Sequence, residues 1–312
     1  MTRSVAFKLV GIGGAHVDRI GHVDGFCAPG ASNPGIMREY VGGGMLNALR
    51  VAHWRGIQDV GLVSVRGGDA AALSVEHAID AAELADLSGR FLDRQTASYT
   101  AIHGPDGDVI TALADMAIYE TCLPRQVRRK PVQQAIAQAA AVMVDANMPA
   151  SAIATTIAKA NGLVFAMAIS PAKIIRLADV LARLDCLFAN SREMFALTGE
   201  TTLDAALNKA IKKYGLKTAI VTDGANATTI IAHGAIDARI LPSPASVVDV
   251  TGAGDALAGA TVAALLAGAP LVDAARQAMA CAACALAIDG PISQATDLNL
   301  FDTHYKALCH EL

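Results

Sequence analysis

The sequence predicts an α/β fold: a mostly parallel sheet covered by helices on both faces, with a small β-sheet attached as a lid. Short apolar runs alternate with longer helical patterns along most of the chain, and one stretch with strong turn chemistry interrupts this alternation. Such alternation is typical of parallel sheets, because each parallel strand pair needs a long crossover that is usually a helix. The chain has 312 residues and no visible internal repeat, so we expect one large domain spanning 1–312.

Composition and charge exclude several other classes of protein. Hydrophobic residues make up 53% of the chain and charged residues 17%, whereas disordered chains combine low hydrophobicity with high charge. The 25 Lys and Arg residues are outnumbered by 29 Asp and Glu residues, which gives a formal net charge of −4. Nucleic-acid binders normally have a basic excess and, for single strands, aromatic stacking platforms, but only 4% of this chain is aromatic. We therefore expect no nucleic-acid partner.

Five apolar runs have the length and composition of buried strands, and eight longer segments have helical spacing. The helical spacing is clearest at Ile174, Leu177, Val180, Leu181 and Leu184, which would share one face of a helix. The predicted strands of the main sheet are 7–12, 141–145, 163–168, 186–189 and 218–222. The predicted helices are 45–55, 71–82, 132–140, 151–161, 172–183, 203–214, 254–266 and 272–288.

The stretch that breaks the alternation predicts a β-hairpin. Two β-like runs, 96–102 and 109–113, are joined by His-Gly-Pro-Asp-Gly-Asp at 103–108, which is strong turn chemistry. Together with a glycine-punctuated stretch nearer the N-terminus, the hairpin predicts a lid whose strands come from about 16–40 and 94–119. Such a sheet can cover a ligand site at the carboxyl ends of the parallel strands. The alternative is an edge hairpin with no role in ligand binding.

One uncharged run, 256–272, raises the question of a membrane span. It is nearly as long as the roughly 20 residues that cross a bilayer, but Ala and Gly dominate it and acidic residues flank it. We expect a buried helix and no membrane partner. The first ten residues lack the pattern of a secretory signal, and the six scattered cysteines indicate reduced thiols rather than a disulfide framework. Both observations favour a cytoplasmic protein.

Two smaller features are given structural roles. The Cys281-x-x-Cys284 pair lies in an alanine-rich helical pattern without a second pair, so we expect packing rather than metal or redox chemistry. The basic cluster 125–130 lies between two prolines of an acidic protein, so we expect a solvated loop rather than a phosphate or nucleic-acid site.

The sharpest chemical signal is the run Asp-Val-Thr-Gly-Ala-Gly-Asp at 249–255, directly before a helical segment. Its two glycines let the backbone turn tightly and expose consecutive N–H groups, and the helix adds the positive end of its dipole. These features predict an anion-binding site with Asp255 beside it. A carboxylate base next to a transferring phosphate is what phosphoryl transfer to a hydroxyl requires. The residues alone leave a second interpretation equally open, in which Asp255 only caps the helix.

This run resembles the carboxy-terminal signature of the ribokinase-like (PfkB-type) carbohydrate kinases. The ordered set of matches covers essentially the whole chain, and it implies a ribokinase-like three-layer α/β/α domain with an ATP-dependent phosphotransferase activity toward an alcohol group. The three further motifs, in the family's order, are Gly42-Gly-Gly-Met-Leu-Asn47 with a closing Gly56, Asn190-Ser-Arg-Glu193, and Thr222-Asp-Gly224 after a strand.

The resemblance implies roles for the residues of the glycine-rich run. Asp255 would be the base that takes the proton from the substrate hydroxyl. Gly252, Ala253 and Gly254 would form the anion hole for the transferring phosphoryl group, because backbone donors stabilise charge where it accumulates.

The resemblance also implies sites for the nucleotide and for cations. Asn190 and Glu193 would organise Mg²⁺ and its waters, since Mg²⁺ prefers oxygen ligands and retains several waters. The structural alternative is that Asn190 caps a helix with Glu193 as its capping-box partner, and both roles can hold together. Asp249 corresponds to a position associated with a monovalent cation such as K⁺, with bracing of the loop as the alternative. The residues expected along the ATP are Asn190, Thr222, Gly224 and Asn226.

The acceptor end is expected where the first predicted strand closes and the first predicted helix begins. Asp18 and Asn47 would bind sugar hydroxyls, since a carboxylate and an amide can each satisfy two of them. Gly42 and Gly43 would let the sugar ring approach closely. His16 stands where the family commonly has an Asn; we assign it to substrate binding, with a purely structural histidine as the alternative.

Within the family the chain is most similar to pseudouridine kinases. The similarity lies in the segments 96–102, 104–107, 114–119 and 145–149, although Ala117 stands where an acidic residue is expected. It implies a nucleoside or C-nucleoside acceptor such as pseudouridine, phosphorylated at its 5′-hydroxyl, with a free sugar such as ribose as the alternative. A sugar phosphate is disfavoured because 96–119 contains no Lys or Arg to bind a second phosphate.

Two other interpretations compete with a kinase. A dehydrogenase would need a glycine at the sixth position of the run that begins at Gly11, but His16 stands there, so the dinucleotide fingerprint fails. A catalytically silent sugar or nucleoside binder on the same fold stays open. The predicted hairpin has a strand edge that needs protection, so we expect a homodimer through the lid.

Overall fold

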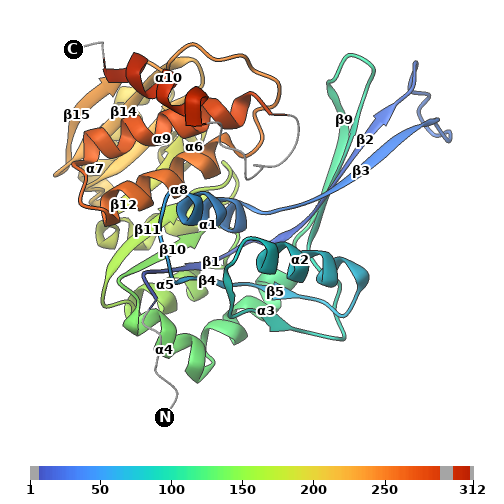
Figure 1. Cartoon of the computed structure of the whole chain (residues 1–312), viewed down its shortest axis with the longest axis horizontal. Coiled ribbons are helices and arrows are strands. Elements are labelled where there is room, and N and C mark those ends of the chain that lie inside the picture. The colour runs from blue at the N-terminus through green and yellow to red at the C-terminus, as the bar shows by residue number, and fades with distance from the viewer. Residues whose placement is uncertain (1–6, 289–297, 310–312) are drawn as a thin grey trace.

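A three-layer arrangement of helices, sheet and helices forms the body of the molecule (Figure 1), which confirms the predicted fold class. The computed structural model describes residues 7–288 and 298–309. Within these ranges one sheet has nine strands in the order β15-β14-β13-β12-β11-β10-β1-β4-β6, parallel from β13 to β6 with β14 and β15 as an antiparallel edge. Its strands span Leu9–Ile12 (β1), Val60–Val63 (β4), Ala85–Asp86 (β6), Ala141–Asp145 (β10), Leu163–Met167 (β11), Cys186–Asn190 (β12), Ala219–Asp223 (β13), Asn226–Ala232 (β14) and Ala235–Ile240 (β15).

Side-chain alternation explains why the central strands are apolar throughout. In β10, Val142 and Val144 pack into the core on one face of the sheet, while Ala141 and Met143 pack into the core on the other. Successive residues of a strand point to opposite faces, so a strand covered on both sides needs apolar residues at every position. The five predicted strands are confirmed, with ends within two residues of those observed. The short β4 and β6 and the β14–β15 hairpin have no counterpart in the sequence prediction.

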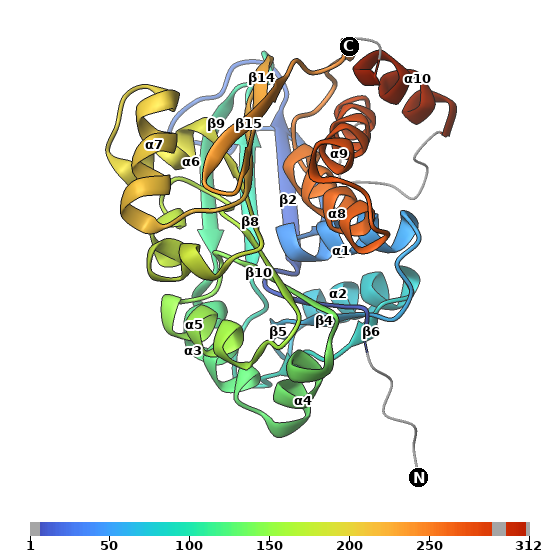
Figure 2. The ribbon, with the colours of Figure 1, turned by 90° about the vertical axis from the view of Figure 1, so that its left-hand side faces the viewer.

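Helices cover both faces of this sheet (Figure 2). On one face lie α3 (Ala117–Val127), α4 (Lys130–Gln138), α5 (Ala150–Lys159), the 3₁₀ segment η1 (Ile174–Arg183), α6 (Ser191–Thr198) and α7 (Leu203–Tyr214). On the other face lie α1 (Gly44–Trp54), α2 (Ala70–Ala81), α8 (Ala253–Leu266), α9 (Leu271–Leu286) and α10 (Leu298–Cys309). All six cysteines lie in the described ranges as free thiols, with Cys281 and Cys284 buried in α9.

A second sheet projects from the body as a long ribbon (Figure 1), and we call it the lid. Its strands, in the order β3-β2-β8-β9, are β2 (His16–Val23), β3 (Gly35–Gly42), β8 (Ser98–His103) and β9 (Val109–Asp115). Strands β8 and β9 pair antiparallel, which confirms the predicted hairpin. A further two-stranded sheet joins β5 (Val65–Arg66) to β7 (Gly89–Arg90).

The segment 172–183, predicted as an α-helix, is a 3₁₀ helix from Ile174 to Arg183. Its turns close through hydrogen bonds of the i→i+3 type, such as Arg176 N–H to the Lys173 carbonyl at 2.9 Å. Three residues per turn bring Ile174, Leu177 and Val180 onto one buried face. Part of the apolar spacing thus fits both kinds of helix, and the sequence pattern alone does not separate them.

The basic cluster 125–130, predicted as a loop, belongs mostly to two helices. Arg125 lies in the last turn of α3, which contains Pro124, and Lys130 begins α4 with Pro131 in its first turn. Proline fits a first helical turn because the N–H that it lacks has no partner there. The Arg and Lys side chains of the cluster are exposed to solvent, as the sequence prediction required.

The uncharged run 256–272 is divided between α8, which ends at Leu266, and α9, which begins after its N-cap Pro270. Small residues let α8 approach α1 closely, since a Cβ at Gly259 would lie 2.1 Å from the Ala48 carbonyl oxygen. This contact brings the start of α8 next to Asn47 of α1. Among the helices of the described residues, none combines the length and the apolar character needed to cross a membrane.

Candidate active site

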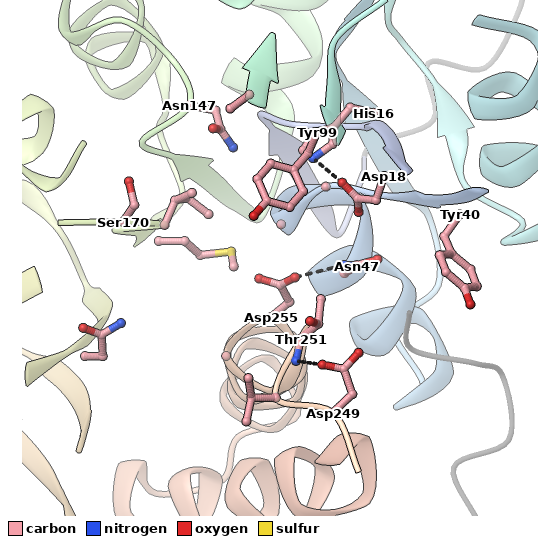
Figure 3. A pocket seen from close by; sticks show the side chains of 18 of the residues that line it. His16, Asp18, Tyr40, Asn47, Tyr99, Asn147, Ser170, Asp249, Thr251 and Asp255 are labelled. Atoms are coloured by element: carbon pink, nitrogen blue, oxygen red, sulfur yellow. Dashed lines mark hydrogen bonds and ion pairs between the residues drawn. The ribbon is translucent and has the colours of Figure 1, made fainter. Parts of the chain in front are cut away.

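A cavity of about 1000 Å³ lies between the body and the lid (Figure 3). Body residues that line it come from the ends of the parallel strands and the segments after them, from the start of α1, and from α8 with the loop before it. Lid residues come from all four lid strands. Open α/β sheets bind their ligands at the carboxyl ends of their strands. The volume is at the upper end of the range of about 300–1,000 Å³ for small-molecule sites, which leaves room for two substrates. The hairpin therefore lines the candidate site rather than forming an edge without a role.

Asp255 lies on the wall of the cavity in the first turn of α8. Gly252, with φ of 80°, ends the preceding loop in the left-handed region and is the N-cap, and no side chain caps this helix. Asp255 instead accepts a hydrogen bond at Oδ2 from Asn47 Nδ2, 3.0 Å away (Figure 3). The capping interpretation of Asp255 is therefore wrong, and its carboxylate is directed toward α1 and the cavity.

The surroundings of Asp255 hold the pKa of its carboxyl at about 7. Removal from bulk water is the largest cause, because it disfavours the charged form. The carboxylates of Asp145, Asp18 and Glu193 raise the pKa further, while the hydrogen bond from Asn47 lowers it. A carboxyl with a pKa near 7 suits a general base at neutral pH.

The start of α1 holds Asn47 in place. Arg50 donates to Asn47 Oδ1 at 3.3 Å and to the Val41 carbonyl at 3.1 Å, so the amide nitrogen of Asn47 is directed to Asp255. Gly43 is the N-cap of α1 with φ of 107°, where a Cβ would lie 2.5 Å from the Gly14 carbonyl oxygen. Only glycine fits this position without strain.

His16 and Asp18 line the cavity from the beginning of the lid strand β2. His16 Nε2 lies 3.3 Å from Asp18 Oδ1 (Figure 3). A Cβ on the neighbouring Gly42 would lie 2.4 Å from Asp18 Oδ2, so the carboxylate packs directly over that glycine. The structure thus brings four of the five residues predicted at the acceptor end into the cavity lining, and Gly42 lies directly against Asp18.

Asn190 and Glu193 form a complete capping box at the start of α6. Asn190 Oδ1 accepts from the Glu193 N–H at 2.9 Å, and Glu193 Oε2 accepts from the Asn190 N–H at 2.8 Å. Both residues also line the cavity, and burial raises the pKa of Glu193 to about 7. One carboxylate and one amide, each with lone pairs left over, suit a Mg²⁺ ion that keeps most of its waters. The structural role is present, and the residues fit the cation role as well.

The remaining predicted nucleotide and cation residues are only partly brought together. Thr222 and Gly254 line the cavity, whereas Gly224, in the exposed turn after β13, and Asn226, the exposed first residue of β14, lie outside its lining. Gly252 and Ala253 begin α8 but do not line the cavity. Asp249 lines the cavity, and its Oδ1 accepts from the Thr251 N–H at 2.8 Å, so this carboxylate braces the loop before α8 (Figure 3).

A buried polar chain on the opposite wall has no assigned role in the sequence prediction. Asp145, fully buried at the end of β10, accepts from the Gly14 N–H at 2.7 Å and from the backbone and side chain of Asn147. Lys173 Nζ donates to Asn147 Oδ1 at 2.6 Å, and both residues line the cavity. Burial raises the pKa of Asp145 and lowers that of Lys173. The segment 145–149 is among those similar to the family, so Asp145 and Asn147 could have been predicted near the site. No motif in the sequence predicts a site role for Lys173.

The lid contributes a face of rings and charges to the cavity. Alternate residues of β2, β3 and β8 point to one side of the sheet. Once the strands are known, this two-residue period identifies the residues that face the cavity. The rings of His22 and His103 lie 5.2 Å apart between centroids. The lining residues of this face that lack an assigned role are Ile20, His22, Arg38, Tyr40, Tyr99 and His103. The sequence argument against a sugar phosphate considered only Lys and Arg within 96–119. Arg38 and Lys173 lie outside that segment, and both line the cavity.

The arrangement combines three chemical elements around one cavity. Asp255 supplies a proton acceptor, the Asn190–Glu193 pair supplies oxygen atoms for a divalent cation, and the start of α8 supplies the positive end of a helix dipole. Phosphoryl transfer to a hydroxyl depends mainly on positioning and on stabilising negative charge, and these elements suit it.

Comparisons with known proteins agree with this geometry. A family model described as pfkB family carbohydrate kinase matches residues 6–297. The chain is similar to a carbohydrate kinase from Agrobacterium tumefaciens, with 36% sequence identity, a TM-score of 0.84, and coverage of 97% of this chain and 98% of that chain. A ribokinase from Arabidopsis thaliana complexed with ribose and ATP has a TM-score of 0.83 at 22% identity, with coverage of 97% and 99%. A ribokinase from Thermotoga maritima has a TM-score of 0.81 at 20% identity, with coverage of 96% and 99%.

Proposed function

This chain belongs to the pfkB family of carbohydrate kinases and has the ribokinase-like fold, and on that premise we propose that it phosphorylates a nucleoside with ATP. Family membership makes the chain a phosphotransferase with an alcohol group as acceptor. The proposed acceptor is a nucleoside or C-nucleoside such as pseudouridine, and the proposed reacting group is its 5′-hydroxyl. ATP as the donor is supported by the Arabidopsis ribokinase of the same fold, which is complexed with ribose and ATP.

The observation that carries the catalytic proposal is the carboxyl of Asp255, with a pKa of about 7, on the cavity wall. Its Oδ2 is engaged by Asn47, so Oδ1 is proposed to take the proton of the acceptor hydroxyl. The hydroxyl oxygen then bonds to the γ-phosphorus as the bond from that phosphorus to the β-phosphate oxygen breaks, and ADP leaves. Gly252, Ala253 and Gly254 are proposed to direct backbone N–H groups at the charge on the transferring group.

Glu193 and Asn190 are proposed to hold Mg²⁺ through its waters, and the ion would supply positive charge beside the phosphates. Thr222 is proposed to contact the nucleotide from the end of β13. K⁺ at Asp249 and pairing of two copies through the lid stay predictions.

The rings of the lid favour a nucleoside over a free sugar. Tyr40, Tyr99 and the His22–His103 pair line the cavity on the lid side. Stacking of an aromatic side chain on a nucleobase contributes about 1–3 kcal/mol per base. A free ribose has no base and cannot make this contact. The hydroxyl groups of the sugar would meet Asp18 and Asn47, while the base lies against the lid.

ATP consumption across a panel of acceptors tests this proposal. The panel contains pseudouridine, uridine, adenosine, inosine, ribose and ribose 5-phosphate, each at several concentrations with ATP and Mg²⁺. We expect the highest kcat/KM with a nucleoside. A higher kcat/KM with ribose would establish the free-sugar alternative, and a preference for ribose 5-phosphate would assign Arg38 and Lys173 to a second phosphate. No turnover with any acceptor, together with measurable binding of one, would leave a catalytically silent binder.

A further inference from the structure

Tyr119 is a fully buried tyrosine that the proposed reaction does not use. It lies in α3, and its hydroxyl reaches the loop between β1 and β2. The Ala15 N–H donates to the Tyr119 hydroxyl oxygen at 3.0 Å, and the hydroxyl donates to the Ala15 carbonyl oxygen at 3.0 Å. Burial raises the pKa of Tyr119 above its ordinary value, so the hydroxyl keeps its proton. A hydroxyl has one proton and two acceptor lone pairs, so these two contacts leave it able to bond a further partner.

His16 lies between this hydroxyl and Asp18, with a polar partner at each ring nitrogen. Its Nδ1 is 3.2 Å from the Tyr119 hydroxyl oxygen, and its Nε2 is 3.3 Å from Asp18 Oδ1. Nδ1 and the hydroxyl can hydrogen-bond in either direction, because a hydroxyl both donates and accepts. Because a carboxylate accepts only, Nε2 must donate to Asp18. Both ring nitrogens of His16 thus have partners within the protein, and neither is left to bind a substrate.

Asp18 is held on both sides by this arrangement. His16 engages Oδ1, while Oδ2 lies against the backbone of Gly42, where a Cβ would come within 2.4 Å. Gly42 is opposite His16 in the β2–β3 register, so the sheet itself sets this contact. The Asp18 side chain keeps 21% of its surface exposed, and Asp18 lines the cavity, whereas the His16 side chain keeps 11%.

We propose that His16 is a positioning residue, which links the buried Tyr119 hydroxyl to Asp18 and fixes the orientation of the carboxylate that binds the acceptor. The inference rests on the proposed function, in which Asp18 binds hydroxyl groups of the sugar. It revises the sequence assignment of His16 as a direct substrate ligand. It also gives Tyr119, the last residue of the 114–119 segment, a role in supporting His16 at the site in addition to core packing.

Steady-state kinetics of single and double variants test the link. His16→Ala is expected to raise the acceptor KM about tenfold, because the hydrogen bond that orients Asp18 is lost. Tyr119→Phe is expected to raise it about threefold, because His16 keeps its contact with Asp18 but loses its support from the hydroxyl. The ATP KM stays unchanged in both. His16→Gln, which keeps a side-chain donor for Asp18, restores most of the acceptor KM. In the His16→Ala background, Tyr119→Phe adds no further rise, because the link is already broken.

The matched control is His53, whose ring nitrogens also face two partners, the Ile57 carbonyl oxygen and Glu83, but which lies outside the cavity lining. His53→Ala should leave the acceptor KM unchanged. Additive effects of His16→Ala and Tyr119→Phe, or loss of thermal stability with an unchanged acceptor KM, would overturn the proposal and leave Tyr119 as a packing residue.

A readout without turnover separates this inference from the proposed function. ¹H–¹⁵N NMR of the ligand-free protein at pH 7 reports the ring nitrogens of His16, assigned by their absence in His16→Gln. We expect a proton on Nε2, the nitrogen that faces Asp18, and in Tyr119→Phe a changed Nδ1 signal. A bare Nε2 in the wild-type protein, or an Nδ1 signal that Tyr119→Phe leaves unchanged, would overturn the link. If no acceptor is phosphorylated, the proposed function fails, while this spectrum still decides whether His16 joins Tyr119 to Asp18.

Discussion

Replacing Asp255 by Asn removes the proposed base but keeps the side-chain shape and an oxygen that can accept from Asn47. A positioned general base contributes about 10²–10⁴-fold to rate. We expect kcat to fall by about 10³-fold, which corresponds to about 4 kcal/mol of activation free energy. The assay belongs at pH 8, one unit above the Asp255 pKa of about 7, where about nine-tenths of the wild-type enzyme carries the ionised base. Nucleotide affinity, measured by calorimetry, should be retained.

The stability of the same variant excludes unfolding as the cause of lost turnover. Because the folded-state pKa of Asp255 lies above the ordinary carboxyl value of about 4, its ionisation destabilises the fold as pH rises through that interval to about 7. At pH 8 this cost is fully present in the wild-type protein and absent from Asp255→Asn, so the variant should unfold at an equal or higher temperature. Asp273→Asn, in the first turn of α9 outside the cavity lining, is the matched control and should keep normal turnover. Turnover of Asp255→Asn within tenfold of the wild-type value would refute the base assignment.

Three further substitutions test neighbouring parts of the site. Asn47→Ala removes the hydrogen bond that lowers the pKa of the base, so the midpoint of the rise of kcat/KM with pH should move to higher pH; an unchanged or lower midpoint would contradict this coupling. Glu193→Gln should raise the Mg²⁺ concentration for half-maximal rate by about 10–100-fold, and equal Mg²⁺ dependence would remove Glu193 from the metal site. Gly259→Ala places a Cβ 2.1 Å from the Ala48 carbonyl oxygen and should lower the free energy of unfolding by about 1–3 kcal/mol in chemical denaturation. Unchanged stability would show that α8 and α1 are less closely packed.

Much of the body could be predicted because its signals are local. Helix α7 spans the predicted residues 203–214, since its apolar spacing is regular and Gly215, with φ of 70°, ends it in the left-handed region. Strand β11 and the first four residues of β10 are continuous apolar runs, as burial on both faces requires. The two-residue strand β6 and the four-residue β4 are too short for periodicity to separate them from loops.

The candidate site was predictable only where a motif carried it. Asn47 and Asp255 lie in separate glycine-rich motifs, 208 positions apart, so the resemblance placed both at the site while their hydrogen bond needed the fold. The sequence of the segment around Lys173 shows only the spacing of its apolar residues. Lys173 lines the cavity and donates a hydrogen bond to Asn147, and neither fact is visible in that spacing. The role of His16, in strand β2, depends on Tyr119 in helix α3, and no spacing in the sequence links the two.

Product identification tests the proposed reaction most directly. Wild-type protein, ATP, Mg²⁺ and the best acceptor of the panel are followed by ³¹P NMR, with Asp255→Asn as the parallel sample. We predict one ADP for each acceptor phosphorylated at its 5′-hydroxyl in the wild-type sample, and no phosphorylated acceptor on the same time scale with the variant. ADP accompanied by free phosphate alone, or the same phosphorylated product at an equal rate from the variant, would contradict phosphoryl transfer to a nucleoside by Asp255.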